Sequence, residues 1–191
     1  MRRRFPWIIL MGLVFVVSIC NHAGAGEFGP FRGKILDADT KEPIEGVVVF
    51  IEWREKHGFK GSTFYDAQET LTDKNGEFYI PGIWAFNPLV WIRAEADAII
   101  YKSGYEAIGF SPWLALLKAK TWRQPVEGRG NYILHVEDGR PVIMLKKLID
   151  VDKRWENVGH ANPGSSTPDE KKKLLMEEFN REEEILRKIK P

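Results

Sequence analysis

Alternating apolar and polar residues predict short β-strands along much of the chain. The strongest pattern covers residues 44–53, where every second position from Val47 to Trp53 is apolar. Val48 and Phe50 make the opposite face apolar as well. Because strands covered on both faces read as continuous apolar runs, we expect this strand to be central in its sheet and covered on both sides.

A tight reversal is predicted within residues 69–82 (ETLTDKNGEFYIPG). Two runs of strand-forming residues flank the four residues from Asp73 to Gly76 there, and Asn and Gly tolerate the positive φ that such a turn needs. We expect a β-hairpin whose second strand ends at Pro81, because proline cannot donate to a strand ladder.

The other expected elements are shorter or less regular. A turn is predicted at residues 103–105, and residues 54–66 are typical of a loop or an irregular edge strand. Ser111 and Pro112 are a helix-start signal. The remaining expected elements are strands at 31–36, 89–95, 132–136 and 141–148 and a short helix at 111–120.

Residues 167–191 predict a C-terminal helix, preceded by a linker at 150–166. Thr167, Pro168 and Glu170 match an N-cap, a proline at the first helical position and the glutamate of a capping box. Favourable pairs four residues apart are expected on its surface. These are Glu177 with Arg181, Glu183 with Arg187 and Glu184 with Lys188.

The helix is amphipathic and has to dock its apolar side, because isolated helices of this length are marginal in water. The apolar side consists of Leu175, Phe179, Leu186 and Ile189. We expect it to lie on the chain's own domain, against Trp91. The alternative is a docking groove on a partner protein.

Residues 1–25 are predicted to be a secretory signal peptide. Three arginines precede an apolar run, and Ala23-Gly24-Ala25 matches a cleavage site. The run has roughly 13 residues, too few for a membrane span of about 20, so we expect cleavage and no transmembrane span afterwards. The expected destination is the periplasm or cell envelope. Cys20 loosely resembles a lipid-attachment site, although Ile19 is bulky where that motif prefers a small residue.

Loss of the leader changes charge and cysteine content. It takes away Arg2, Arg3 and Arg4 and no acid, so the net charge moves from +1 to −2. A chain without basic excess cannot neutralise phosphates, which argues against a nucleic-acid partner. Cys20 is the single cysteine, so the mature chain has no disulfide and no thiol nucleophile.

Several turn and core signals follow one another in a specific order. They are Gly33 with Asp37, the segment Pro43-Ile44-Glu45-Gly46, the pattern Thr72-Asp73-x-x-Gly76-x-Phe78, and Gly104-Tyr105. In this order and spacing the chain resembles the carboxypeptidase regulatory-like domain.

The resemblance implies a mainly β fold: a seven-stranded, antiparallel prealbumin/Ig-like β-sandwich, here over residues 26–149 and followed by the C-terminal amphipathic helix. It covers residues 31–105, with residues 142–145 as the last strand, whereas residues 106–140 are longer than the family pattern. Such modules accompany enzymes, transporters and surface proteins, so the resemblance also implies a non-catalytic role in folding, positioning or binding.

The candidate chemistry in the sequence is sparse, and we expect no cofactor. His57, His135 and His160 lack the short spacing of metal ligands. The oxygen-rich turns at Asp37 and Asp73 do not complete a calcium loop with its terminal glutamate, so a turn role is favoured. The carboxylates, including Glu52, Glu69, Glu77 and Glu95, are too numerous for any pair to be assigned as acid and base of a glycosidase.

Tryptophan is abundant in the mature chain. Trp84, Trp91, Trp113 and Trp122 fall in loops or at outward-facing positions, where aromatic rings stack on sugars. Large aromatic residues more often fill cores. The sequence therefore favours an exported structural or protein-interaction module with an envelope or secreted protein partner, and a carbohydrate-binding or hydrolytic domain is the alternative.

Overall fold

The computed structural model describes residues 29–56, 61–83, 94–109, 133–137 and 140–190. Among these residues the chain is mainly β with a C-terminal helix, as expected. The strands are β1 (Phe31–Asp37), β2 (Val48–Lys56), β3 (Ser62–Leu71), β4 (Glu77–Ile80), β5 (Ala94–Tyr101), β6 (Ile108–Gly109), β7 (Ile133–Glu137) and β8 (Arg140–Leu145). The helices are α3 (Val151–His160), the 3-10 helix η2 (Asp169–Lys171) and α4 (Lys173–Ile189).

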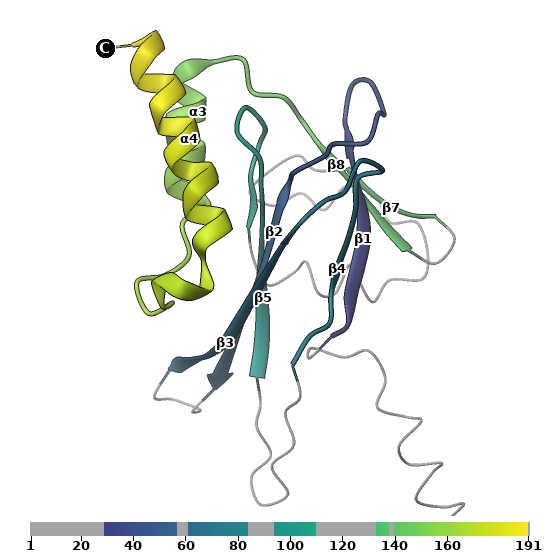
Figure 1. Ribbon diagram of the computed structural model, residues 1–191, viewed down its shortest axis with the longest axis vertical. Helices are drawn as coiled ribbons and strands as arrows, with labels where there is room; N and C mark the ends of the chain where they lie inside the picture. Colours follow the sequence, from purple (N-terminus) through teal and green to yellow (C-terminus); the bar gives the residue numbers. More distant parts are fainter. Residues whose placement is uncertain (1–28, 57–60, 84–93, 110–132, 138–139, 191) are drawn as a thin grey trace, which may run out of the picture.

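The strands form two four-stranded sheets (Figure 1). The first has the order β4-β1-β8-β7 and the second the order β3-β2-β5-β6. β2 pairs with β3 on one side and β5 on the other, so its predicted central position is confirmed. Residues 54–66, expected to be a loop or an irregular edge strand, include the end of β2 and the first half of β3, and β3 is an edge strand of this sheet.

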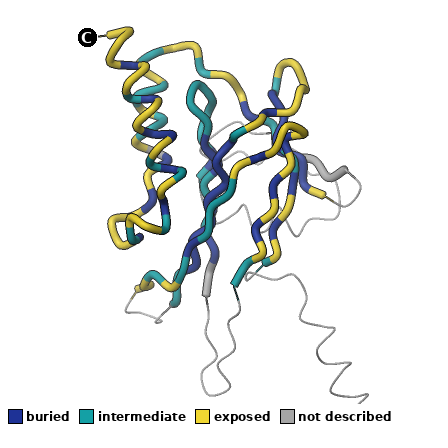
Figure 2. Tube along the Cα trace, viewed as in Figure 1, coloured by how far each residue is buried: buried dark blue, intermediate teal, exposed yellow. Residues whose placement is uncertain are grey.

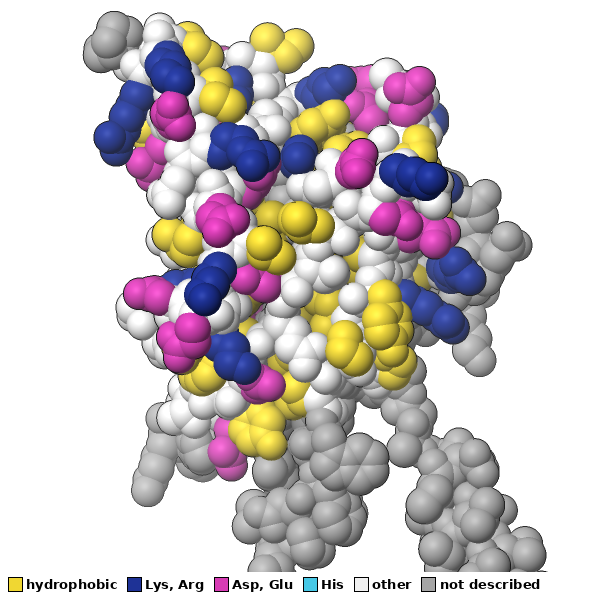
Figure 3. Space-filling model, viewed as in Figure 1, with side chains coloured by type: hydrophobic (Ala, Val, Ile, Leu, Met, Phe, Trp, Pro, Cys, Tyr) yellow, Lys and Arg dark blue, Asp and Glu magenta, His cyan; other side chains and the backbone are white. Residues whose placement is uncertain are grey.

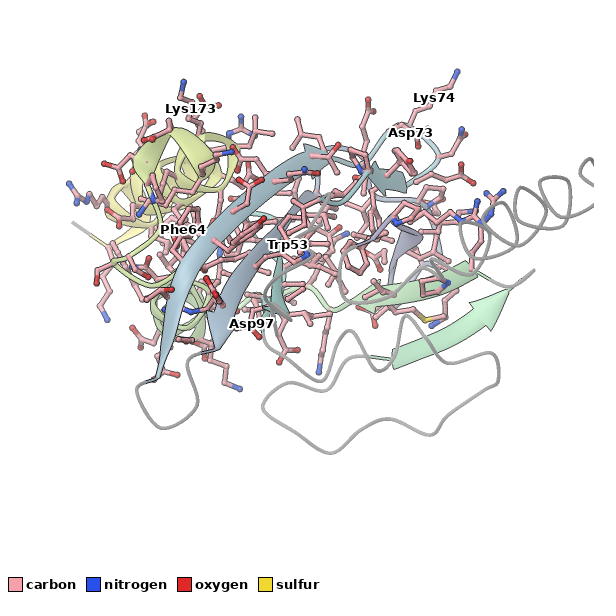
Figure 4. All side chains as sticks on the ribbon, turned by 90° about the horizontal axis from the view of Figure 1, so that it is seen from below. Trp53, Phe64, Asp73, Lys74, Asp97 and Lys173 are labelled. Atoms are coloured by element: carbon pink, nitrogen blue, oxygen red, sulfur yellow. The ribbon has the colours of Figure 1, made fainter. Side chains whose placement is uncertain are left out.

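An apolar core lies between the two sheets. Phe31 and Trp53 come from opposite sheets, and their ring centroids lie 6.1 Å apart. Figure 4 shows Trp53 in this central position. The predicted inward face of β2 is confirmed, because its alternate residues belong to this core. The second sheet and Val47, just before β2, contribute Val47, Val49, Ile51, Trp53, Ala96, Ala98 and Ile100, and the first sheet contributes Phe31, Ile35, Phe78, Ile80, Ile143 and Leu145.

The two helices cover the outer face of the second sheet (Figures 1 and 2). Val48 and Phe50 of β2 and Tyr101 of β5 face outward there and are buried against Leu175 and Phe179 of α4. β2 is therefore covered on both faces, as its apolar pattern predicted. The residues that cover this outer face of β2, Leu175 and Phe179, are more than a hundred positions further along the chain.

The predicted hairpin at 69–82 is wrong in its pairing. The turn itself is present, with Gly76 N donating to Asp73 O at 2.8 Å and Asp73 N donating to Glu77 O at 2.9 Å. However, β3 pairs with β2, whereas β4 pairs with β1 in the other sheet. The turn therefore carries the chain from one sheet to the other, because turn chemistry fixes the reversal and not the partner of each strand.

The expectation of purely antiparallel pairing also needs correction. β1 and β8 run parallel, with Lys34 opposite Val142 and Asp37 opposite Leu145. Parallel neighbours need a long connection, and the long stretch of chain between these two strands supplies it.

The linker predicted at 150–166 is wrong for most of its length, because α3 occupies Val151–His160. Asp150 is its N-cap, and the Asp150 carboxylate accepts hydrogen bonds from Asp152 N and Lys153 N. Trp155 and Val158 are half-buried, and Val158 packs against the apolar cluster on the outer face of the second sheet. A short apolar face and a single cap are weak sequence signals, and α3 gains its stability by packing on α4 and the sheet.

The C-terminal helix begins differently from the prediction. Pro168 precedes the 3-10 helix η2, and neither η2 nor α4 has a side-chain cap from its own N-cap residue. The capping box predicted at Thr167 and Glu170 is therefore wrong. The pairs of Glu183 with Arg187 and of Glu184 with Lys188 are confirmed, whereas Arg181 pairs with Glu178 rather than with Glu177.

The other strand predictions near the described residues are mostly confirmed. The strand expected at 31–36 is β1, and those expected at 132–136 and 141–148 correspond to β7 and β8. The turn at 103–105 is present, with Tyr105 N donating to Lys102 O at 3.0 Å. The helix predicted at 111–120 and most of the strand predicted at 89–95 lie outside the described residues.

Candidate functional site

The C-terminal helix docks on its own domain, as expected, through the apolar side predicted from the sequence. Leu175, Phe179 and Leu186 are buried, and the Phe179 ring meets Tyr101 edge-on at 4.5 Å between centroids. Ile189, the fourth predicted residue, is 53% exposed. Three of the four candidate partner-docking residues are thus used inside the molecule.

Buried carboxylates fix α4 in this position. Glu182 is 1% exposed and receives two hydrogen bonds from the Arg154 guanidinium of α3, at 2.7 Å from Nε and 2.6 Å from Nη2. The Ser103 hydroxyl donates to the same carboxylate at 2.5 Å. Burial raises the pKa of Glu182, but the hydrogen bonds from Arg154, Ser103 and the Gly104 backbone outweigh it, so its pKa lies below the usual value.

Glu178, one turn earlier, makes a second connection to the same turn of the sheet. Its Oε1 accepts from Ser103 N at 3.0 Å and lies 3.8 Å from Lys102 Nζ. Arg181 Nη1 lies 2.9 Å from its other oxygen. The turn predicted at 103–105 is therefore the place where the sheet, α3 and α4 meet.

The N-terminus of α4 is capped by a carboxylate from β3. Glu69 accepts from Leu174 N at 2.8 Å and from Leu175 N at 3.1 Å, one hydrogen bond to each of its oxygens. Lys171 Nζ reaches Asp66 Oδ1 of the same strand at 2.6 Å. A negative charge at this end of a helix is favourable because the first N–H groups have no partner within the helix.

The outward face of the helical pair is charged. Figure 3 shows Lys, Arg, Asp and Glu side chains interspersed over the face of α4 that is turned to the viewer. Lys190 Nζ at the end of α4 lies 2.8 Å from Asp152 Oδ1 at the start of α3. This ion pair places the last turn of α4 beside the first turn of α3.

Three isoleucines near this end of the helical pair are exposed. Ile149, just before α3, is 90% exposed, and Ile185 and Ile189 of α4 are also exposed. The exposed ion pair between Lys190 and Asp152 joins the ends of the two segments that carry these residues. We call Ile149, Ile185 and Ile189 the isoleucine tip.

A second polar cluster ties the two sheets together at Asp37. The Tyr105 hydroxyl donates to Asp37 Oδ2 at 3.0 Å, and Lys147 Nζ lies 3.3 Å from the same oxygen. Burial raises the pKa of Asp37, but hydrogen bonds from the backbone of Thr40 and Asp39 and from Tyr105 and Lys147 lower it to about 2. Asp37 therefore acts as a structural anion at the end of β1.

The other predicted site residues are distributed as follows. Trp84, Trp91, Trp113 and Trp122 lie outside the described residues, as does His57. The turn roles of Asp37 and Asp73 are confirmed, since each carboxylate accepts two backbone N–H groups of its own turn. In the part of the chain that the structure describes, no group of three or more His, Cys, Asp or Glu side chains is arranged to hold a metal ion.

Sequence reasoning missed the connections that fix the helical pair. The carboxylates considered as a set separate in the structure: Glu52 pairs with Arg54, Glu69 caps α4, and Glu77 lies 3.5 Å from Arg140. The cap joins residues 105 positions apart, so no local pattern could have revealed it.

Comparisons with known proteins give no relative for this chain: no family model matches it, and neither a curated protein nor a solved structure matches. Among the described residues, no helix has the length and apolar character needed to cross a membrane.

Proposed function

We propose that the chain is an exported, non-catalytic module with a structural or protein-interaction role in the cell envelope. Its fold would be the prealbumin/Ig-like β-sandwich of the carboxypeptidase regulatory-like domain. The sequence resemblance supports the fold and the non-catalytic role, and the leader pattern of residues 1–25 supports export.

One observation carries the interaction role: the helical pair packs on the second sheet and ends in the isoleucine tip. Leu175, Phe179 and Leu186, the face that the sequence alternative assigned to a partner, are buried inside, so a partner would have to bind the residues that remain exposed. Ile149 at 90% exposure is costly to leave in water, because a fully buried isoleucine gains about 1.5–3 kcal/mol. A protein partner that covers the tip would recover part of this free energy.

A pull-down from the envelope fraction tests the proposal. The mature chain is compared with the double variant Ile149→Ser/Ile189→Ser and with Tyr79→Ser, a control at an exposed aromatic residue of the other sheet. We expect a specific protein to be recovered with the mature chain and the control but not with the double variant, while all three melt at similar temperatures.

Recovery of the same protein with the double variant would show that the isoleucine tip does not bind it. Recovery of no protein with any form would remove the interaction role. A glycan screen would then become the next experiment, because the sequence alternative assigns sugar binding to Trp84, Trp91, Trp113 and Trp122.

A further inference from the structure

Asn75 and Gly76 lie in the turn that carries the chain from β3 to β4. They form the only Asn-Gly pair in the sequence, and Asn75 is exposed. An asparagine followed by glycine can react with its own backbone, because glycine has no side chain to shield its nitrogen. Figure 4 shows the neighbouring Lys74 pointing away from the molecule, so water and base reach this turn.

The reaction breaks the side-chain amide of Asn75. Gly76 N attacks Cγ of Asn75 and closes a cyclic imide (succinimide), while Nδ2 leaves as ammonia with the proton of Gly76 N. Water then opens the ring at either carbonyl. Opening at Cγ gives aspartate in place of Asn75, and opening at the backbone carbonyl gives isoaspartate, in which the main chain runs through Cβ and Cγ.

The folded turn holds Gly76 N away from the Asn75 side chain. Gly76 N donates to Asp73 O at 2.8 Å, and Asn75 is not among the residues with a positive φ, so the turn is of type I. The third residue of a type I turn has a ψ of about 0°, which places the following nitrogen beside that residue's own nitrogen rather than beside its side chain. Formation of the succinimide therefore requires the turn to open.

The carboxylate of Asp73 keeps the turn closed. Its Oδ1 accepts hydrogen bonds from Asn75 N and from Glu77 N, both at 2.9 Å. Gly76 O accepts from Ile35 N at 2.8 Å, which ties the turn to β1. The packing is close there, because a Cβ built on Gly76 would overlap with Ile35 O. The same turn thus protects Asn75 and would be distorted by its modification.

We propose that Asn75 is a modification site that the Asp73 turn keeps latent: local opening lets it deamidate, and isoaspartate then detaches the turn from β1. Isoaspartate adds a backbone carbon before Gly76, so the bonds that Gly76 makes to Asp73 and Ile35 cannot both keep their geometry. Phe78, two positions after Gly76, belongs to the core between the sheets. The modified chain would therefore hold β4, at the edge of the first sheet, less firmly.

Incubation of the mature chain at mildly alkaline pH tests the proposal. Peptide mapping by mass spectrometry follows loss of the Asn75 amide, and an isoaspartyl methyltransferase with labelled S-adenosylmethionine reports isoaspartate. We expect the folded chain to react about tenfold or more slowly than the chain unfolded in urea, because a hydrogen-bonded turn is open for only a small fraction of the time. The isoaspartate form, separated by ion exchange, should melt at a lower temperature than the unmodified chain.

Three variants identify what protects Asn75. Asp73→Ala should raise the rate about tenfold, because the turn loses both hydrogen bonds to the carboxylate. Lys74→Ala, at an exposed position of the same turn, is the matched control and should react as slowly as the natural chain. Asn75→Ser cannot form the ring and should acquire no methyl label in this peptide.

Circular dichroism checks that each variant folds. If Asp73→Ala does not fold, the natural chain in urea below its unfolding transition replaces it. The rate at Asn75 should then rise with urea concentration, because urea favours the open turn.

Three results would overturn the proposal. The first is a folded chain that deamidates at Asn75 as fast as the unfolded chain, or no reaction there in either state. The second is a folded Asp73→Ala that reacts no faster than Lys74→Ala, or, if the variant does not fold, a rate that urea leaves unchanged. The third is an isoaspartate form that melts at the temperature of the unmodified chain, because β1 and the turn would then stay attached.

Discussion

Arg154 of α3 and Glu182 of α4 form a two-point ion pair at 2.7 and 2.6 Å, with the carboxylate 1% exposed. This pair joins the two helices at the point where both meet the turn after β5. A buried charge that loses its partner is strongly destabilising, whereas a buried pair replaced as a whole by apolar residues need not be. The pair therefore specifies how the helices dock.

Arg154→Met is expected to lower the free energy of unfolding by about 3–5 kcal/mol, because Glu182 stays buried without its cation. The double variant Arg154→Met/Glu182→Leu should recover most of this loss. Urea unfolding measures both. Arg187→Met, which breaks an exposed pair with Glu183, is the control and should cost about 0–1 kcal/mol. A cost for Arg154→Met no larger than the control's would contradict the role of the pair.

Glu69→Ala is expected to cost about 1 kcal/mol, the usual effect of losing a helix cap, because Leu174 N and Leu175 N lose their acceptor. The matched control is Glu77→Ala, whose ion pair with Arg140 is exposed. Urea unfolding compares the two, and hydrogen exchange of the first turn of α4 should accelerate only in Glu69→Ala. Equal costs and unchanged exchange would show that the cap contributes nothing.

The lowered pKa of Asp37 predicts that the free energy of unfolding decreases at acidic pH. Its pKa is about 2 in the folded chain against a usual 3.8, so the unfolded chain binds the proton more readily. Its contribution, about 2 kcal/mol, is fully present above about pH 5 and is lost progressively as the pH falls towards 2.

Asp37→Asn should therefore be less stable than the natural chain at about pH 7, and the difference should shrink below about pH 5. Urea unfolding at several pH values measures this. A difference that stays constant from pH 7 down to about 2 would mean that the Asp37 charge is not what stabilises the turn.

Tyr101→Phe is expected to leave the chain equally stable or to stabilise it by about 1 kcal/mol. The Tyr101 hydroxyl is buried and has no hydrogen-bond partner within the described residues, and burial raises its pKa. Phe removes this oxygen while keeping the edge-on contact with Phe179. A loss of more than about 1 kcal/mol in thermal or urea unfolding would reveal a hydrogen bond to the hydroxyl.

The sequence predicted those parts of the fold that depend on local pattern. The two apolar faces of β2 could be predicted because two alternating series of apolar residues begin at Val47 and Val48. The first series packs in the core between the sheets, and the second packs against the helices. Leu175, Phe179 and Leu186 were visible from helical spacing for the same reason. In both cases the period of the backbone decides which residues share a face.

Features that join distant parts of the chain could not be predicted. The turn at Asp73 was correct, but the assignment of β3 and β4 to different sheets depends on their partners. In the sequence Glu69 is one of many carboxylates, and its role as the cap of α4 depends on the folded chain placing Leu174 N beside it.

Hydrogen exchange of the intact mature chain tests the central claim most directly, which is that the helical pair is a fixed part of the β module. The slowest amides of α4, around Phe179 and Glu182, should exchange as slowly as those of β2 around Phe50, because both would open only when the whole module unfolds. Fast exchange throughout α4 beside a protected β2 would contradict the claim. It would return Leu175, Phe179 and Leu186 to the role of a docking face for a partner.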